Sequence, residues 1–314
     1  MRFELSTLID PGLWALAAES RAFYARRPSG RGPNSLEELR VFRAGSPAPI
    51  ECDPQPTVEI VHAAGRDVSV RIHMPVSAPI AGVFLEIHGG GFYMGSATGS
   101  DVRNRELVEE LGIAVVSVDY RLAPEYPWPA APDDCETAAL WLVEHAEERF
   151  GTTRLAVGGF SAGATLAAST LVRLRDRGLH AFRGGVLQFG TYDLAAQTPA
   201  GRLIADEYFL TAYAGAAADR THPDLSPLFA DLVGLPPILI VVGSDDILLE
   251  DNLAMAARLS AVGVKVDLSI YPASPHAFTG HGTAMARAAH DDINAWFRER
   301  LGPANATRST EAIG

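Results

Sequence analysis

Ser161 lies in a short motif of the kind that presents a nucleophile. The motif G-F-S-A-G spans residues 159–163, follows an apolar run and precedes a segment rich in Ala and Leu. In a strand–turn–helix this tight, glycine at both flanks relieves crowding and leaves the serine hydroxyl exposed at a helix N-terminus. Backbone N–H groups there favour developing negative charge. The motif predicts Ser161 as a nucleophile, whereas taken alone it also fits a glycine-rich turn with an incidental serine.

A second glycine-rich turn, H-G-G-G-F at residues 88–92, follows the apolar run 80–87. Consecutive glycines let a backbone approach a ligand and present its N–H groups. We expect the N–H groups of Gly90, Gly91 and Ala162 to hold the oxyanion of a tetrahedral intermediate. A flexible loop or a phosphate cradle is the alternative, but neither a dinucleotide fingerprint nor a Walker lysine follows the turn.

A carboxylate and then a histidine follow two later apolar runs. Asp245 and Asp246 come after residues 237–242, and His276 comes after residues 266–271. The histidine would take the proton of the serine and return it to the leaving group, and the carboxylate would orient the imidazole. The chain order Ser, Asp, His is the order expected in an α/β-hydrolase sheet. Residue types alone leave the choice between Asp245 and Asp246 open.

These residues need a scaffold of buried strands, and the sequence provides its pattern. Two alternating segments, 57–61 and 68–72, predict an antiparallel pair. Short apolar runs then predict strands buried on both faces, at 80–87, 113–118, 155–157, 185–189, 237–242 and 266–271. Helical patterns between them occupy 103–111, 133–149, 162–175 and 252–262. This alternation predicts an open α/β sheet, with ligand chemistry at the carboxyl ends of its strands.

The regions outside this alternation are distinct. Residues 12–26 carry apolar side chains on one helical face and predict an amphipathic helix. A loop-rich, helical-looking insertion lies between Gly190 and Pro236, and a polar tail begins at about Pro303.

The composition limits which classes of molecule the chain is expected to bind. The chain has 314 residues and a formal net charge of −12, which opposes binding to nucleic-acid phosphates and to anionic lipid, and fits a small neutral substrate. Cys52 and Cys135 have no metal-site spacing, so we interpret both as free thiols. We expect no secretion signal, no membrane span, no metal and no cofactor, and a cytoplasmic location.

The chain resembles the hormone-sensitive-lipase-like family of α/β-hydrolase esterases from about Ile80 to Phe297. The resemblance rests on the turn at 88–92, the serine motif, D-Y-R-L-A-P-E at 119–125, P-A at 129–130, S-P-L at 226–228 and the segment 235–248. The family places its acid in an Asp-x-Leu pattern, which selects Asp246 over Asp245.

The resemblance implies an α/β-hydrolase fold with a mostly parallel sheet, helices on both faces and a helical cap. The implied organisation is a cap segment at 1–55 and a catalytic domain at 56–302 that carries a cap insertion at about 191–225, followed by the tail 303–314. It implies a serine carboxylesterase that acts on short-to-medium acyl esters without a cofactor, and it suggests a homodimer.

Two positions depart from the family pattern. Phe160 stands where an Asp usually precedes the serine, and Ala277 stands where the base is usually followed by Gly. Neither change removes a catalytic group, but both could reshape the pocket. We expect Phe160, His88 and Phe92 to contact the substrate.

Two other functions use the same residues. An amidase or lactonase would share the site, and only a substrate panel separates them from an esterase. A non-catalytic receptor of this fold binds a small molecule in the capped pocket, but such a binder typically lacks part of the Ser-His-Asp set, which is complete here.

Overall fold

The structure, a computed structural model, describes residues 4–27, 32–48, 50–76 and 79–302. The predicted polar tail lies outside the described residues. Within them, eight strands form one sheet in the order β1-β2-β4-β3-β5-β6-β7-β8. The strands are β1 (Thr57–Ala63), β2 (Arg66–His73), β3 (Val83–Ile87), β4 (Ala114–Asp119), β5 (Leu155–Phe160), β6 (Phe182–Gln188), β7 (Ile238–Gly243) and β8 (Val266–Tyr271).

The sheet is parallel from β4 to β8 and antiparallel at its N-terminal edge. β1 pairs with β2, and β2 pairs with β4, in antiparallel register, whereas the other neighbours run parallel. Strands β3 and β7 are buried at every position, as continuous apolar runs in a doubly covered sheet should be. The predicted mostly parallel α/β fold is confirmed.

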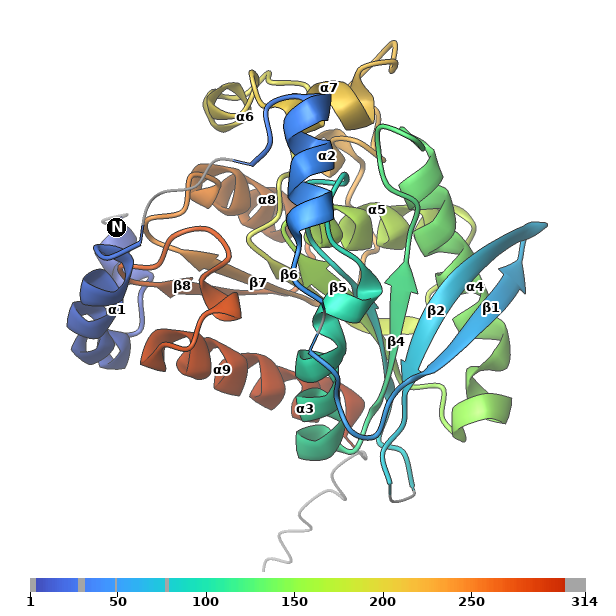
Figure 1. Cartoon of the computed structure of the whole chain (residues 1–314). Helices are drawn as coiled ribbons and strands as arrows, with labels where there is room; N and C mark the ends of the chain where they lie inside the picture. The colour runs from blue at the N-terminus through green and yellow to red at the C-terminus, as the bar shows by residue number, and fades with distance from the viewer. Residues whose placement is uncertain (1–3, 28–31, 49, 77–78, 303–314) are drawn as a thin grey trace, which may run out of the picture.

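Helices cover both faces of this sheet (Figure 1). The α-helices are α1 (Ala17–Tyr24), α2 (Leu36–Gly45), α3 (Asp101–Leu111), α4 (Ala130–Phe150), α5 (Ala162–Asp176), α6 (Pro199–Leu203), α7 (Tyr208–Ala214), α8 (Leu249–Ala261) and α9 (Ala284–Leu301). Short 3-10 helices are η1 (Leu5–Thr7), η2 (Pro11–Leu16), η3 (Ala97–Ser100), η4 (Pro227–Phe229) and η5 (Phe278–Gly280). Helices α3 and α9 pack on one face, and α4, α5 and α8 pack on the other.

Three helices differ from the sequence-based expectation. The predicted helix at 12–26 is a 3-10 segment that Pro11 begins, followed by α1 from Ala17. Helices α2 and α9 were not predicted. The α9 pattern is visible in hindsight, because Met285, Ala289, Ile293 and Phe297 recur every four residues and are all buried.

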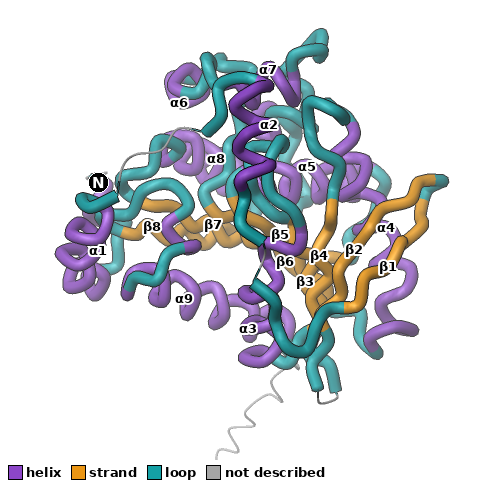
Figure 2. Tube along the Cα trace, viewed as in Figure 1, coloured by secondary structure: helices purple, strands orange, loops and turns teal. Residues whose placement is uncertain are grey.

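The N-terminal segment packs against the rest of the protein in two separate places. Helix α1 packs against α9, close to β8. Helix α2 lies near α7 at the end of the sheet where the parallel strands finish (Figure 2). The two helices therefore reach different loops of the same sheet edge.

Two further expectations concern thiols and membranes. Cys52 and Cys135 are both free thiols, as predicted. In the part of the chain that the structure describes, none of the helices combines the length and apolar character that crossing a bilayer requires.

Candidate active site

Ser161 sits at a strained turn between β5 and α5. Its φ of 53° is rare for a residue with a side chain. The backbone N–H of Ser161 donates to the carbonyl of Gln188 at 2.9 Å. A Cβ at Gly159 or Gly163 would stand 2.1 or 2.0 Å from the carbonyl oxygen of Ile87, so only glycine fits at either flank. The glycines thus press the turn against the end of β3 and leave the serine projecting from it.

His276 lies between Ser161 and a carboxylate. Its Nε2 atom is 2.9 Å from the Oγ atom of Ser161, and its Nδ1 atom is 3.0 and 3.1 Å from the two carboxylate oxygens of Asp246. The three side chains follow β5, β7 and β8, so the parallel register brings them to one edge of the sheet. Such a chain of contacts can move a proton from a hydroxyl to an imidazole.

The two neighbouring aspartates occupy different environments. Asp246 is 6% exposed, and its carboxylate also accepts the backbone N–H of Leu248 at 2.8 Å. Asp245 is exposed, and it accepts the hydroxyl of Ser244 at 2.8 Å. Of these two aspartates, only Asp246 contacts His276.

The glycine turn after β3 adopts backbone angles that suit glycine. Gly90 has a φ of 122° and Gly91 a φ of 60°, and a Cβ at Gly90 would meet the Met94 carbonyl oxygen at 2.1 Å. The Met94 N–H donates back to the Gly90 carbonyl at 2.8 Å, which closes the turn. Ala162 is the first residue of α5, so its N–H has no partner within the helix. These three residues are the predicted oxyanion donors.

His88 and Phe92 lie in the protein interior, at 2% and 1% exposure. His88 Nδ1 is 2.8 Å from the Gly89 carbonyl, and its ring stacks on Tyr120 with centroids 4.1 Å apart. Burial lowers the pKa of His88 to about 4, so its imidazole is neutral at physiological pH. The ring of Phe92 stacks on Tyr213 at 4.0 Å. That both residues contact substrate stays a prediction; the contacts described here support the glycine turn.

Phe160 is half-buried and lies beside the turn. A Cβ at Gly89 would be 2.5 Å from its ring, so the missing side chain of Gly89 makes room for Phe160. Its ring centroid is 6.4 Å from that of Phe189. Phe160 therefore lies between the glycine turn and Phe189, which in turn lies near His276.

Phe189 contacts His276 and was not predicted from the sequence. Its ring lies edge-to-face with His276, with centroids 5.1 Å apart and planes at 75°. It is buried and has a φ of 40°, an unusual angle for a bulky residue. The only sequence signal is its place directly after β6, at the same sheet edge as the other site residues.

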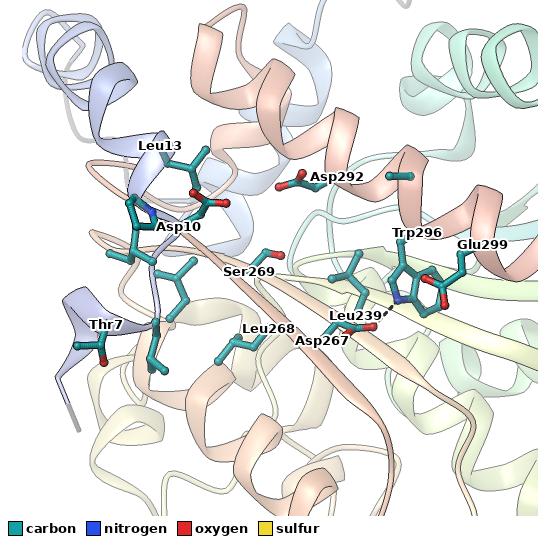
Figure 3. Close-up of a pocket in the computed structure, with 15 residues that line it drawn as sticks. Thr7, Asp10, Leu13, Leu239, Asp267, Leu268, Ser269, Asp292, Trp296 and Glu299 are labelled. Carbon is teal, nitrogen blue, oxygen red and sulfur yellow. Dashed lines mark hydrogen bonds between the residues drawn. The ribbon is translucent and has the colours of Figure 1, made fainter. Parts of the chain in front are cut away.

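One cavity of the structure lies away from these residues. A cavity of about 640 Å³ opens between the N-terminal segment, β8 and α9 (Figure 3). Asp267, Asp292 and Glu299 give it an acidic lining, and Trp296 Nε1 donates to Asp267 at 2.9 Å. None of the predicted site residues lines this cavity. Across the described ranges, groups of three or more His, Cys, Asp or Glu side chains placed to hold a metal ion are absent.

Comparison with known proteins covers most of the chain. The profile of a family described as alpha/beta hydrolase fold matches residues 84–280. A carboxylic ester hydrolase, LipN of Mycobacterium tuberculosis, is 32% identical over an alignment of 298 residues that covers 86% of this chain and 77% of that protein. An ethyl acetate hydrolase of Pseudomonas putida is 33% identical over 239 residues, with 71% and 75% of the two chains covered.

Solved structures show the same similarity in three dimensions. The crystal structure of EstE5 soaked with p-nitrophenyl butyrate superposes with a TM-score of 0.74 and 29% sequence identity. The superposition covers 93% of this chain and 99% of the other.

Proposed function

Because this chain belongs to the hormone-sensitive-lipase-like family of α/β-hydrolase carboxylesterases, we propose that it hydrolyses esters of short-to-medium acyl chains through Ser161, His276 and Asp246. The chain belongs to the enzyme class of carboxylic ester hydrolases. Beyond this class, we propose that Ser161, His276 and Asp246 carry out the reaction, that it passes through an acyl-enzyme intermediate, and that the acyl chain is short to medium in length.

In the proposed acylation step, His276 Nε2 accepts the proton of Ser161 as the serine oxygen attacks the ester carbonyl carbon. The carbonyl π electrons move to its oxygen and form a tetrahedral oxyanion. When this intermediate collapses, the bond to the alcohol oxygen breaks, and the imidazolium of His276 protonates the leaving alcohol. Asp246 stabilises that imidazolium and holds its orientation.

Deacylation repeats the sequence with water. His276 removes a proton from the water, the resulting oxygen attacks the acyl carbon, and Ser161 leaves with the proton from the imidazolium. The products are the carboxylic acid and the free serine. In both steps the N–H groups of Gly90, Gly91 and Ala162 would stabilise the oxyanion, and one such donor is worth roughly 10²–10³ in rate.

The segments around the site would form the proposed cap. Helix α2 and helix α7 lie at the sheet edge that carries the proposed residues (Figures 1 and 2). The side chains of Tyr93, Tyr208 and Phe209 form an aromatic cluster, with Tyr93 centroids 6.2 and 6.3 Å from the other two. An apolar wall of this kind suits an acyl or alcohol group of limited length.

The observation that supports the mechanism most directly is the unbroken contact from Ser161 Oγ through His276 to Asp246. The test is hydrolysis of p-nitrophenyl acetate, butyrate, octanoate and palmitate by the wild type and by Ser161→Ala. We expect turnover that is highest on the short chains and falls by several orders of magnitude in the variant. Ser260→Ala, an exposed serine of α8, is the matched control.

Three outcomes would change the proposal. Full activity in folded Ser161→Ala would remove the serine mechanism. Highest activity on palmitate would remove the short-chain assignment. Faster cleavage of the matching anilide or lactone than of the ester would move the activity to an amidase or lactonase.

A further inference from the structure

Arg43 of helix α2 reaches the glycine turn and binds its backbone. Its Nε and Nη2 atoms donate to the Tyr93 carbonyl at 3.0 and 2.8 Å, and Nη2 also donates to the Ala123 carbonyl at 2.6 Å. Its Nη1 atom forms an ion pair with Glu125 at 2.7 Å. One guanidinium thus engages two segments, at Tyr93 and at Ala123 to Glu125, that are far from α2 in sequence. Hydrogen bonds from a cationic donor are the stronger kind, and the planar guanidinium fixes their directions.

The two carbonyls belong to a small backbone network around the proposed oxyanion donors. The N–H of Tyr93 donates to the Gly90 carbonyl at 3.2 Å, directly within the turn. The N–H of Ala123 donates to the Phe92 carbonyl at 3.0 Å, and so joins the second segment to the first. Arg43 binds the carbonyls of both Tyr93 and Ala123, and so connects this backbone network to helix α2.

Attachment of α2 does not depend on Arg43 alone. Leu39 is fully buried in the main core, and the hydroxyl of Tyr93 donates to the Pro33 carbonyl at 3.1 Å. The arginine contacts are therefore additional, and they are directed to the main chain of the turn. Main-chain orientation is what decides where the N–H groups of Gly90 and Gly91 point.

We propose that Arg43 is a positioning residue for ester hydrolysis, holding the Gly90–Gly91 backbone in the orientation that receives the oxyanion. The inference rests on the proposed function, because it takes those N–H groups as the oxyanion donors. The N-terminal segment then contributes to the chemical step as well as covering the site. A small displacement of a catalytic group can cost about 10²-fold in rate.

The test separates stabilisation of the oxyanion from substrate binding. For Arg43→Ala we expect kcat on p-nitrophenyl butyrate to fall roughly 10- to 100-fold while KM stays within about 2-fold. Inhibition by butaneboronic acid, which forms a tetrahedral adduct with a serine oxygen, should weaken by a similar factor as kcat falls. Guanidinium ion at non-denaturing concentration should restore part of the kcat of Arg43→Ala and none in Ser161→Ala. Arg40→Ala, an exposed arginine of the same helix that pairs with Glu37, should behave as wild type.

The outcomes distinguish this inference from the proposed function. If boronic acid fails to inhibit the wild type and Ser161→Ala remains active, the serine mechanism itself fails. If those two experiments succeed and folded Arg43→Ala keeps its kcat, or loses activity only through KM, the role of Arg43 is refuted. Arg43→Gln, which keeps much of the aliphatic stem, replaces Arg43→Ala should the latter not fold, and the same kcat criterion applies to it.

Discussion

The carboxylate of Asp246 makes a forked contact with the ring of His276, with both of its oxygens within 3.0–3.1 Å of Nδ1. The Asp246 side chain has no exposed area, whereas the His276 side chain is one-third exposed. A buried acceptor on Nδ1 keeps the proton of the neutral ring there and leaves Nε2 free to accept the proton of Ser161.

Replacing this carboxylate should therefore damage the chemical step. In Asp246→Asn the amide can donate to Nδ1 and favour the wrong tautomer of His276, so we expect kcat to fall by roughly 10³–10⁴. Asp245→Asn is the matched control, because Asp245 is exposed and contacts Ser244 instead. Steady-state kinetics on p-nitrophenyl butyrate measure both variants, and a larger loss in Asp245→Asn would reverse the assignment.

The turn that carries the proposed oxyanion donors should not tolerate a side chain at Gly90. The Cβ of Gly90→Ala would stand 2.1 Å from the Met94 carbonyl oxygen, at a φ of 122° that alanine avoids. We expect a loss of kcat of at least about 10²-fold, because displacement of the turn moves its N–H groups. Gly99→Ala has open space around its Cβ and should keep wild-type kinetics. Equal kinetics in the two variants would show that the turn does not bind the oxyanion.

Asp251, at the beginning of α8, should make the stability of the protein depend on pH. It is buried and accepts the backbone N–H of Tyr192. Burial raises its pKa from 3.8 to about 7, and the charges of Asp193 and Glu250 act in the same direction. Between about pH 4 and pH 7 the unfolded chain releases this proton and the folded protein keeps it. The free energy of unfolding contributed by Asp251 is therefore lost as the pH rises through this window.

Asp251→Asn isolates that contribution. The difference in unfolding free energy between wild type and variant should fall by the order of 3–4 kcal/mol from pH 4 to pH 7 and stay level above it. Denaturant titrations at several pH values measure it. The wild type must be compared with the variant because His88 and His290 also titrate. Their lowered pKa values make the unfolding free energy rise with pH over much of the same range, opposite to the contribution of Asp251. A difference that does not change with pH would contradict the prediction.

Arg173, itself part-buried, should be a large contributor to stability through its ion pairs, two of which are with the buried carboxylates of Asp224 and Glu136. Its guanidinium donates to Asp224 at 2.7 and 2.8 Å, and it also contacts Asp133 at 2.8 Å and Glu136 at 3.2 Å. Arg173→Met would leave buried carboxylates without this partner, which typically costs about 3–5 kcal/mol. Arg149→Met breaks the more exposed pair with Glu59 and should cost less than about 1 kcal/mol. Equal losses of unfolding free energy in the two variants would show that the ion pairs of Arg173 stabilise the protein no more than the exposed pair of Arg149.

The strands and the nucleophile motif could be predicted because their signals are local. Apolar runs such as 238–243 must be buried on both faces, and the glycines around Ser161 are required by contacts with the adjacent strand. The choice between Asp245 and Asp246 is different. Adjacent residues differ here in burial and in contact with His276, and that difference depends on how the loops after β7 and β8 meet.

Contacts between distant segments left no pattern to recognise. Phe189 reaches His276 because β6 and β8 both flank β7, so its aromatic type alone does not indicate the contact. Arg43 binds carbonyl groups, which every residue carries, and so nothing in the sequence of its partners marks them. Helix α9 was not predicted, although its buried apolar residues recur every four positions.

The docking of α1 joins two parts of the chain that are synthesised far apart in time. The buried hydroxyl of Ser20 donates to the Ala273 carbonyl at 2.5 Å, across 253 positions, and the Tyr24 hydroxyl is 3.0 Å from His281 Nδ1. During synthesis on the ribosome, α1 has no docking partner until the loop around His276 has emerged. Until then its apolar side chains lack the surface that covers them in the folded protein. Hydrolytic activity can therefore arise only after the loop that follows β8 and carries His276 has been synthesised.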